Sequence, residues 1–157
     1  MLNGYAGAYA RQPDMIVNTR PANGNIPFGL ALTYDTNKNV AVFGTQSDNS
    51  FVGVAAREVK SATDYLTQSA GAYNTGDAVP VFMRGSINVI CQRSTPSLGG
   101  AVYVRTAPNG SYPNCVVGGF EAEDDSGKML MLGNCQWGGP ADANGVAELV
   151  ILTRGKA

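Results

Sequence analysis

The sequence of 157 residues contains no histidine. This absence excludes every mechanism in which a histidine acts as general base, including the Ser-His-Asp and Cys-His arrangements. It also removes the commonest ligand of transition metals. Catalysis by paired carboxylates or by lysine stays open, but we predict that the chain is not an enzyme and that it holds no metal and no cofactor.

Cysteines are few, and Cys91, Cys115 and Cys135 form no CxxC motif. Three thiolates without a histidine do not complete a four-ligand zinc site unless a carboxylate or another chain contributes. An odd number of cysteines is also unusual for a disulfide-bonded secreted protein. We therefore expect three free thiols that pack as small hydrophobic side chains in a reducing compartment.

Charged residues make up only 15% of the chain, against about 25% in an average soluble protein. The 11 Lys and Arg residues are scattered and the net charge is −1, so we expect no nucleic-acid partner. The first ten residues have neither a basic region nor a continuous apolar run, so we predict no signal peptide. No apolar run approaches the roughly 20 residues of a membrane helix, so we expect no membrane partner and synthesis in the cytosol.

Turn-forming residues are abundant, with 20 Gly and 8 Pro. They separate about nine short β-prone runs, a spacing typical of all-β domains. We predict an all-β fold, a single compact β-barrel or jelly-roll-like sandwich over residues 21–157, preceded by an extended N-terminal arm over residues 1–20. The predicted strands cover residues 28–34, 40–44, 51–59, 78–83, 87–91, 101–105, 115–120, 129–137 and 146–152.

Two segments carry more specific expectations. Residues 78–83 and 87–91 are predicted to form a hairpin around the tight turn Arg84-Gly85-Ser86, with Pro80 at a sheet edge or a bulge. Residues 55–70 combine apolar residues at helical spacing with poor helix formers. A short helix and a strand that runs into a long loop both stay open for this segment.

An acidic segment from Glu121 to Lys128 holds four of the 12 carboxylates but lacks the spacing of a calcium loop. We expect a solvated hairpin tip, or else an electrostatic contact with a basic partner. Charge asymmetry supports that contact, because residues 119–157 carry three basic and six acidic residues, whereas residues 1–118 carry eight and six. An enzyme would need two carboxylates to converge in a cleft, chosen from Glu121, Glu123, Asp124, Asp125 and Asp77.

Aromatic residues suggest a second alternative. Trp137 with Tyr73, Tyr103 and Tyr112 would form a stacking platform for a sugar, as in a glycan-binding β module of a virion attachment structure. A lone Trp beside a strand is more often part of a core or an interface.

Four blocks occur in a familiar order: Asn25–Leu32, Phe51–Ala55, Tyr73–Val89 and Gly99–Tyr103, followed by a closing apolar strand. Together they resemble the structural cement, or head decoration, proteins of tailed bacteriophages. The resemblance implies a β-rich subunit that binds the outer surface of the assembled head, clamps neighbouring major capsid protein subunits and catalyses nothing. It also implies synthesis in the bacterial cytoplasm and self-association, for which we expect a homotrimer rather than a homodimer.

The N-terminal arm is the predicted partner interface. Tyr and Arg dominate interface hot spots, and an ordered arm adds buried area to each subunit. The alternative is that the arm folds back onto its own domain. The candidate contact residues are Leu2, Tyr5, Tyr9, Arg11, Met15 and Ile16.

Overall fold

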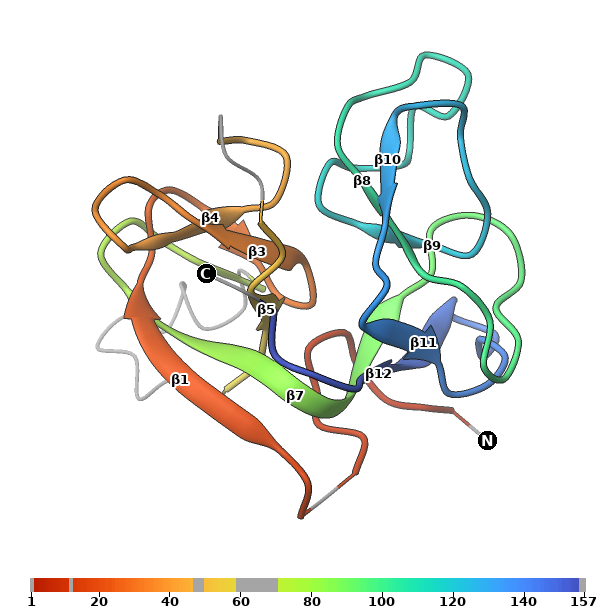
Figure 1. The fold of residues 1–157 in the computed structure, drawn as a ribbon, viewed down its shortest axis with the longest axis horizontal. Coiled ribbons are helices and arrows are strands. Elements are labelled where there is room, and N and C mark those ends of the chain that lie inside the picture. The colour runs from red at the N-terminus through yellow and green to blue at the C-terminus, as the bar shows by residue number, and fades with distance from the viewer. Residues whose placement is uncertain (1, 12, 47–49, 59–70, 156–157) are drawn as a thin grey trace.

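The computed structural model describes residues 2–11, 13–46, 50–58 and 71–155 (Figure 1). Within them the chain forms strands and no helix, which confirms the all-β prediction. The described residues thus contain no helix that could cross a bilayer. The strands are β1 (Ile16–Pro21), β2 (Ile26–Pro27), β3 (Ala31–Tyr34), β4 (Val40–Val42), β5 (Gly53–Ala55), β6 (Ala72–Tyr73), β7 (Ala78–Ile90), β8 (Tyr103–Arg105), β9 (Phe120–Glu121), β10 (Met129–Met131), β11 (Cys135–Trp137) and β12 (Val146–Ile151).

The strands form three sheets. A seven-stranded sheet has the order β11-β12-β7-β5-β3-β4, with β1 also paired to β7. A three-stranded sheet has the order β10-β8-β9, and β2 pairs with β6. The outer strands β4 and β11 do not pair with each other, so the described strands do not make a closed barrel. The sheets instead pack against one another in a sandwich-like arrangement (Figure 1).

The longest strand, β7, replaces the predicted hairpin. Its first half pairs with β1 and β5, and its second half pairs with β12. The hairpin prediction is wrong because each half finds its own partner strands and the two halves do not pair with each other. Gly85 adopts a φ of +109° within the strand, where an added Cβ would overlap the backbone oxygen of Asp14. The residue bends the strand instead of reversing it.

Pro80 does not lie at a sheet edge or a bulge. It pairs with Thr19 of β1 on one side, and its carbonyl accepts the Ala56 N–H at 3.0 Å on the other. In an antiparallel strand the N and O atoms of one residue face the same neighbour. The missing N–H of Pro80 therefore faces the chain just beyond β5, where the strand pairing on that side ends.

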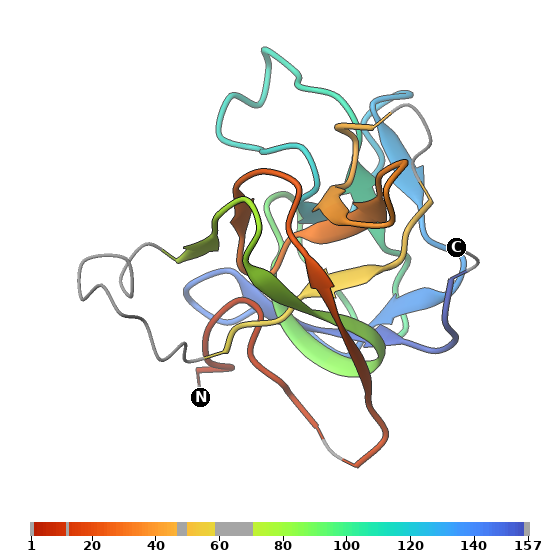
Figure 2. The same ribbon diagram turned by 90° about the vertical axis from the view of Figure 1, so that its left-hand side faces the viewer.

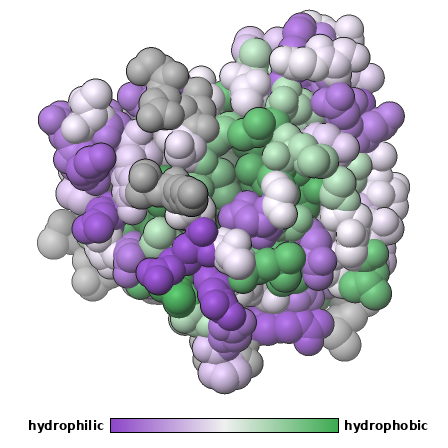
Figure 3. Space-filling view, viewed as in Figure 1, coloured by the Kyte–Doolittle hydropathy of each residue, from purple (hydrophilic) through white to green (hydrophobic). Residues whose placement is uncertain are grey.

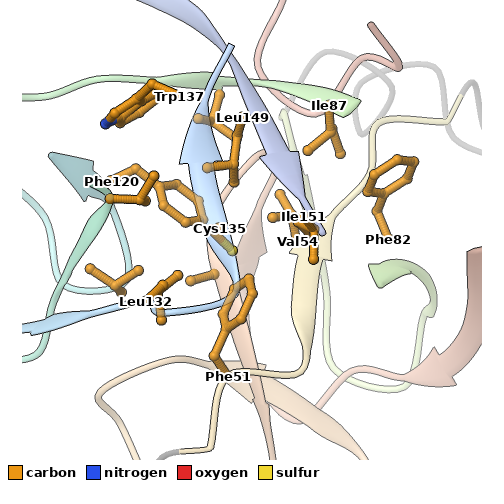
Figure 4. Packing of buried hydrophobic residues seen from close by; sticks show 14 of the residues in the cluster. Phe51, Val54, Phe82, Ile87, Phe120, Leu132, Cys135, Trp137, Leu149 and Ile151 are labelled. Carbon is orange, nitrogen blue, oxygen red and sulfur yellow. The ribbon is translucent and has the colours of Figure 1, made fainter. Parts of the chain in front are cut away.

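Alternation along the central strands creates two apolar clusters. Val54 and Phe82 point into a large cluster, whereas the neighbouring Ala55 and Val81 point into a smaller one on the other face of the sheet. Figure 4 shows that the large cluster also gathers side chains from the ends of other strands. Its labelled members are Phe51, Val54, Phe82, Ile87, Phe120, Leu132, Cys135, Trp137, Leu149 and Ile151.

Several predicted strands are shorter than expected. The run 51–59 contributes only β5, and the run 129–137 is split into β10 and β11 by a turn at residues 132–134. The choice between helix and loop for residues 55–70 largely concerns positions 59–70, which lie outside the described residues.

Candidate interaction surfaces

The N-terminal segment before β1 lies along β7 and β12 (Figure 2). The side-chain amide of Asn3 donates to the Val146 carbonyl at 2.8 Å, and Asn88 donates through its own amide to the Asn3 carbonyl. Gly7 N–H donates to the Asn88 carbonyl at 2.7 Å. The predicted boundary at residue 20 falls inside β1, whose residues pair with β7.

Three of the predicted contact residues are exposed at this segment. Leu2 and Tyr5 are 63% and 70% exposed. Arg11 is exposed as well, but its Nε donates to Glu148 at 2.7 Å. The hydrogen bond from Arg11 lowers the pKa of the Glu148 carboxyl below its usual range. Leu2 and Tyr5 are therefore the members of the predicted set that present free side-chain surface outward.

The other three predicted residues face the domain. The Tyr9 ring stacks on Phe82 with centroids 5.6 Å apart, and its hydroxyl donates to Glu58 at 3.1 Å. Burial raises the pKa of Tyr9 to about 12. Met15 packs against the large cluster, and Ile16 is a partly buried residue of β1. These contacts anchor the segment, while a role in binding another chain stays a prediction.

Tyr5 belongs to an arrangement that the sequence did not reveal. The Arg57 guanidinium lies over the Tyr5 ring at 4.7 Å and over the Phe28 ring at 5.8 Å. Phe28 in turn packs edge-on against Tyr73, with centroids 4.9 Å apart. The three residues Tyr5, Arg57 and Phe28, here called the Arg57 platform, lie far apart in the sequence, so no local motif could have indicated them.

The acidic segment begins inside the protein, which corrects the prediction of a solvated hairpin tip. Glu121 is 0% exposed and accepts hydrogen bonds from Arg105 at 2.6 and 3.0 Å. Arg105 is also fully buried, and Arg93 donates to the same carboxylate at 2.8 Å. Two guanidinium groups thus hold Glu121, which leaves it unsuited to act as a general acid or base.

Asp125 extends this ion network toward the surface. Its carboxylate accepts hydrogen bonds from the Asn109 amide at 2.9 and 3.0 Å and from Arg105 at 2.9 Å. The Asn109 hydrogen bonds, followed by those of Arg105, lower the pKa of Asp125 below its usual range. The network fixes the loops on both sides of β9.

Glu123 and Asp124 are the exposed carboxylates of the segment. One Arg93 nitrogen donates to both of their backbone carbonyls, at 2.7 and 2.8 Å. Within the described residues, no group of three Asp, Glu, Cys or His side chains could hold a metal ion. These two residues are called the acidic turn below.

The predicted sugar platform is wrong. Trp137 is 0% exposed and packs in the large cluster, as Figure 4 shows, and Tyr73 is 0% exposed as well. Neither ring can stack on a bound sugar. The prediction of free thiols is confirmed, because Cys91, Cys115 and Cys135 form no disulfide. Burial raises the pKa of the Cys135 thiol to about 12.

Comparison with known proteins identifies the family of this chain. A family model described as "Structural cement protein (E217 gp24/Pam3 gp6)" matches residues 1–152. The chain belongs to this family of phage structural cement proteins. The resemblance noted in the sequence is thereby confirmed, together with the assignment of a cement role on a phage capsid.

One solved structure shares the fold of this cement protein. A chain from the capsid of Myoviridae phage XM1 has a TM-score of 0.74 at 16% identity, over 96% of this chain and 91% of that chain. A chain of the head fiber gp8.5 N base of bacteriophage phi29 has a TM-score of 0.45 at 18% identity, over 91% of this chain and 99% of that chain. No curated protein matches the sequence.

The cement protein exposes apolar side chains at the edge strand β10. Leu130 and Met131 are 44% and 57% exposed, and β10 pairs only with β8 among the described strands. Figure 3 shows hydrophobic residues gathered near the middle of the same face of the molecule. An exposed apolar edge strand offers both side chains and unpaired backbone groups to another protein.

Proposed function

We propose that the protein binds the outer surface of the assembled phage head and holds neighbouring major capsid protein subunits together without catalysing a reaction. The observation that carries this proposal is membership of the structural cement family over residues 1–152. The fold shared with a chain from the capsid of phage XM1 supports it. We also propose that the protein self-associates, as a homotrimer rather than a homodimer.

The apolar edge at β10 is the proposed contact with the capsid protein. Met is enriched and charged residues are depleted at the centres of protein interfaces, and Leu130 and Met131 of β10 are both exposed. Leu2 and Tyr5, the most exposed of the predicted arm residues, are proposed to contact a neighbouring subunit. Many such contacts repeated on a lattice hold a shell by avidity, without a deep pocket.

The test is decoration of heads that were assembled without the protein. We expect the variant Met131→Glu to bind such heads about tenfold more weakly or worse, because an unpaired carboxylate buried in an apolar contact costs at least about 1.4 kcal/mol. Leu98→Glu is the matched control, since Leu98 is 80% exposed in the loop between β7 and β8 and is not part of β10. The bound fraction is measured by co-sedimentation over a range of protein concentrations.

Equal binding by Met131→Glu and the wild type would remove β10 from the interface, and a wild type that does not bind heads at all would contradict the cement role. Deleting residues 1–20 is not a clean test of the arm, because the deletion removes most of β1. Point variants of Leu2 and Tyr5 leave β1 and its pairing intact.

A further inference from the structure

We propose that the Arg57 platform of one subunit binds the acidic turn of a second copy of this chain. The inference deepens the proposed self-association by naming its contact, and in that sense it rests on the proposed function. It starts from two charged groups, the Arg57 guanidinium and the Asp124 carboxylate, that each lack an ion-pair partner among the described residues.

Arg57 is exposed, and no carboxylate among the described residues lies within ion-pair distance of it. By contrast Arg11, Arg84, Arg93 and Arg105 each pair with a carboxylate. A guanidinium that stacks by its face on an aromatic ring keeps its N–H edge available for a carboxylate. Arg57 is thus held in place, and no described residue uses its hydrogen-bonding edge.

The platform is also firmly supported. Phe28 packs against the fully buried Tyr73, and the Arg57 N–H donates to the Gly7 carbonyl at 2.8 Å. An arginine that is already ordered loses less side-chain entropy when it binds a partner. Tyr and Arg together are the residue types found most often at interface hot spots.

The acidic turn is also held in a fixed conformation, by hydrogen bonds from Arg93. Arg93 fixes the backbone carbonyls of Glu123 and Asp124 and is itself held by the buried Glu121. The Glu123 side chain is 62% exposed and lies 3.5 Å from Arg93. The Asp124 carboxylate contacts no cation in the described part of the chain, so it is available to pair with an arginine in a bidentate manner.

The two surfaces lie on different flanks of the molecule. In Figure 1 the chain that leaves β5 toward residue 58 lies on the lower left, whereas the loop between β9 and β10 lies on the right. A contact between two different patches is heterologous and closes into a ring when the rotation allows, whereas a two-fold dimer could use this contact only if the platform and the acidic turn belonged to one self-complementary patch. Like charges oppose platform-to-platform and turn-to-turn contacts. A head-to-tail ring therefore accounts for a trimer better than for a two-fold dimer.

Charge reversal of each surface tests the contact. Sedimentation velocity of the full chain without heads, over a concentration series, gives the dissociation constant of self-association. We expect Arg57→Glu and Asp124→Arg each to weaken self-association about tenfold or more. The double variant, Arg57→Glu with Asp124→Arg, is expected to regain most of it, because the opposite charges face each other again. Arg57→Lys is expected to be intermediate, since lysine lacks the planar fork.

Arg20→Glu is the control, because Arg20 is an exposed arginine of β1 outside the platform. Tyr5→Ala weakens the platform without a charge change and guards against misfolding of Arg57→Glu. A wild type that stays monomeric, single variants that associate normally, or a double variant without recovery would each overturn the proposal. A variant that loses head binding while its self-association is normal would assign Arg57 to the capsid protein and would also overturn it. A wild type that self-associates through this contact but does not bind heads would refute the cement role alone.

Discussion

Neighbouring residues of the seven-stranded sheet point into two different apolar clusters, whereas those of the three-stranded sheet point into one apolar cluster and one ion network. Val81 and Phe82 of β7 are both 0% exposed and serve the two clusters. In the small sheet, Val104 joins the large cluster, while Arg105 and Glu121 pair with each other. At these positions both sheets are therefore buried on two faces, by different chemistry.

The difference follows from the side chains on the second face of each sheet. In the small sheet these include Arg105 and Glu121, both charged and fully buried, whereas the equally short strand β5 supplies apolar residues to both clusters of the large sheet. A buried ion pair costs desolvation free energy and is tolerated only when its hydrogen bonds are nearly complete. Such a pair consequently holds its neighbours in one geometry, and here it positions the loop that carries the acidic turn.

The largest expected effect comes from breaking the ion network. Glu121→Ala removes the carboxylate shared by Arg93 and Arg105 and leaves a buried guanidinium without its main partner. We expect a loss of about 3–5 kcal/mol in the free energy of unfolding, measured by urea denaturation. The matched control Glu123→Ala removes an exposed carboxylate of the same loop and is expected to change it by less than about 0.5 kcal/mol. Equal effects of the two variants would show that the network does not stabilise the small sheet.

A smaller loss is expected in the large sheet from Gly85→Ala. The residue has a φ of +109°, and a Cβ there would overlap the Asp14 carbonyl oxygen. A strained backbone of this kind costs about 1–3 kcal/mol, again measured by urea denaturation. Gly139→Ala is the control, because a Cβ at Gly139 meets no atom within 4 Å. If both variants were as stable as the wild type, β7 would not depend on the bend at Gly85.

The sequence predicted the class of the fold because β-prone runs and turn residues are local signals. The run 146–152 matches β12 almost residue for residue. The same local signals failed at Arg84-Gly85-Ser86, since a tight turn and a bent strand use the same residue types. Only the distant partners β1 and β12 decide between them.

Local sequence patterns could not predict the ion network around Glu121 or the Arg57 platform, because both join residues that are distant in the sequence. Glu121 and Arg105 are 16 residues apart in the chain and meet because β8 pairs with β9. Arg57 meets Tyr5 only because the N-terminal segment runs beside it, with Gly7 accepting its N–H. The exposed acidic turn could be anticipated from composition, whereas the burial of Glu121 at its start could not.

The smallest expected effect is a pH dependence confined to the small sheet. The pKa of Asp125 is lowered in the folded protein, mainly by Asn109 and then by Arg105. The ionised Asp125 therefore contributes its full stabilisation of the folded state above the unfolded pKa of about 3.9. This stabilisation is lost as the pH falls through the lower pKa of the folded state. Asp125→Asn should be less stable than the wild type at neutral pH, and the gap should shrink on acidification below about pH 4.

Urea denaturation at neutral and acidic pH measures the difference in the free energy of unfolding between the wild type and Asp125→Asn. Any difference that remains at the lowest pH reflects altered packing and hydrogen bonding, not the lost charge. Amide hydrogen exchange locates the effect, which should accelerate exchange in the loops around β9 before it reaches β7. Among the described residues β7 takes part in no buried ion pair, so its exchange should follow only global unfolding. A gap that stays constant with pH, or faster exchange in β7 first, would show that the two sheets do not differ in how charge stabilises them.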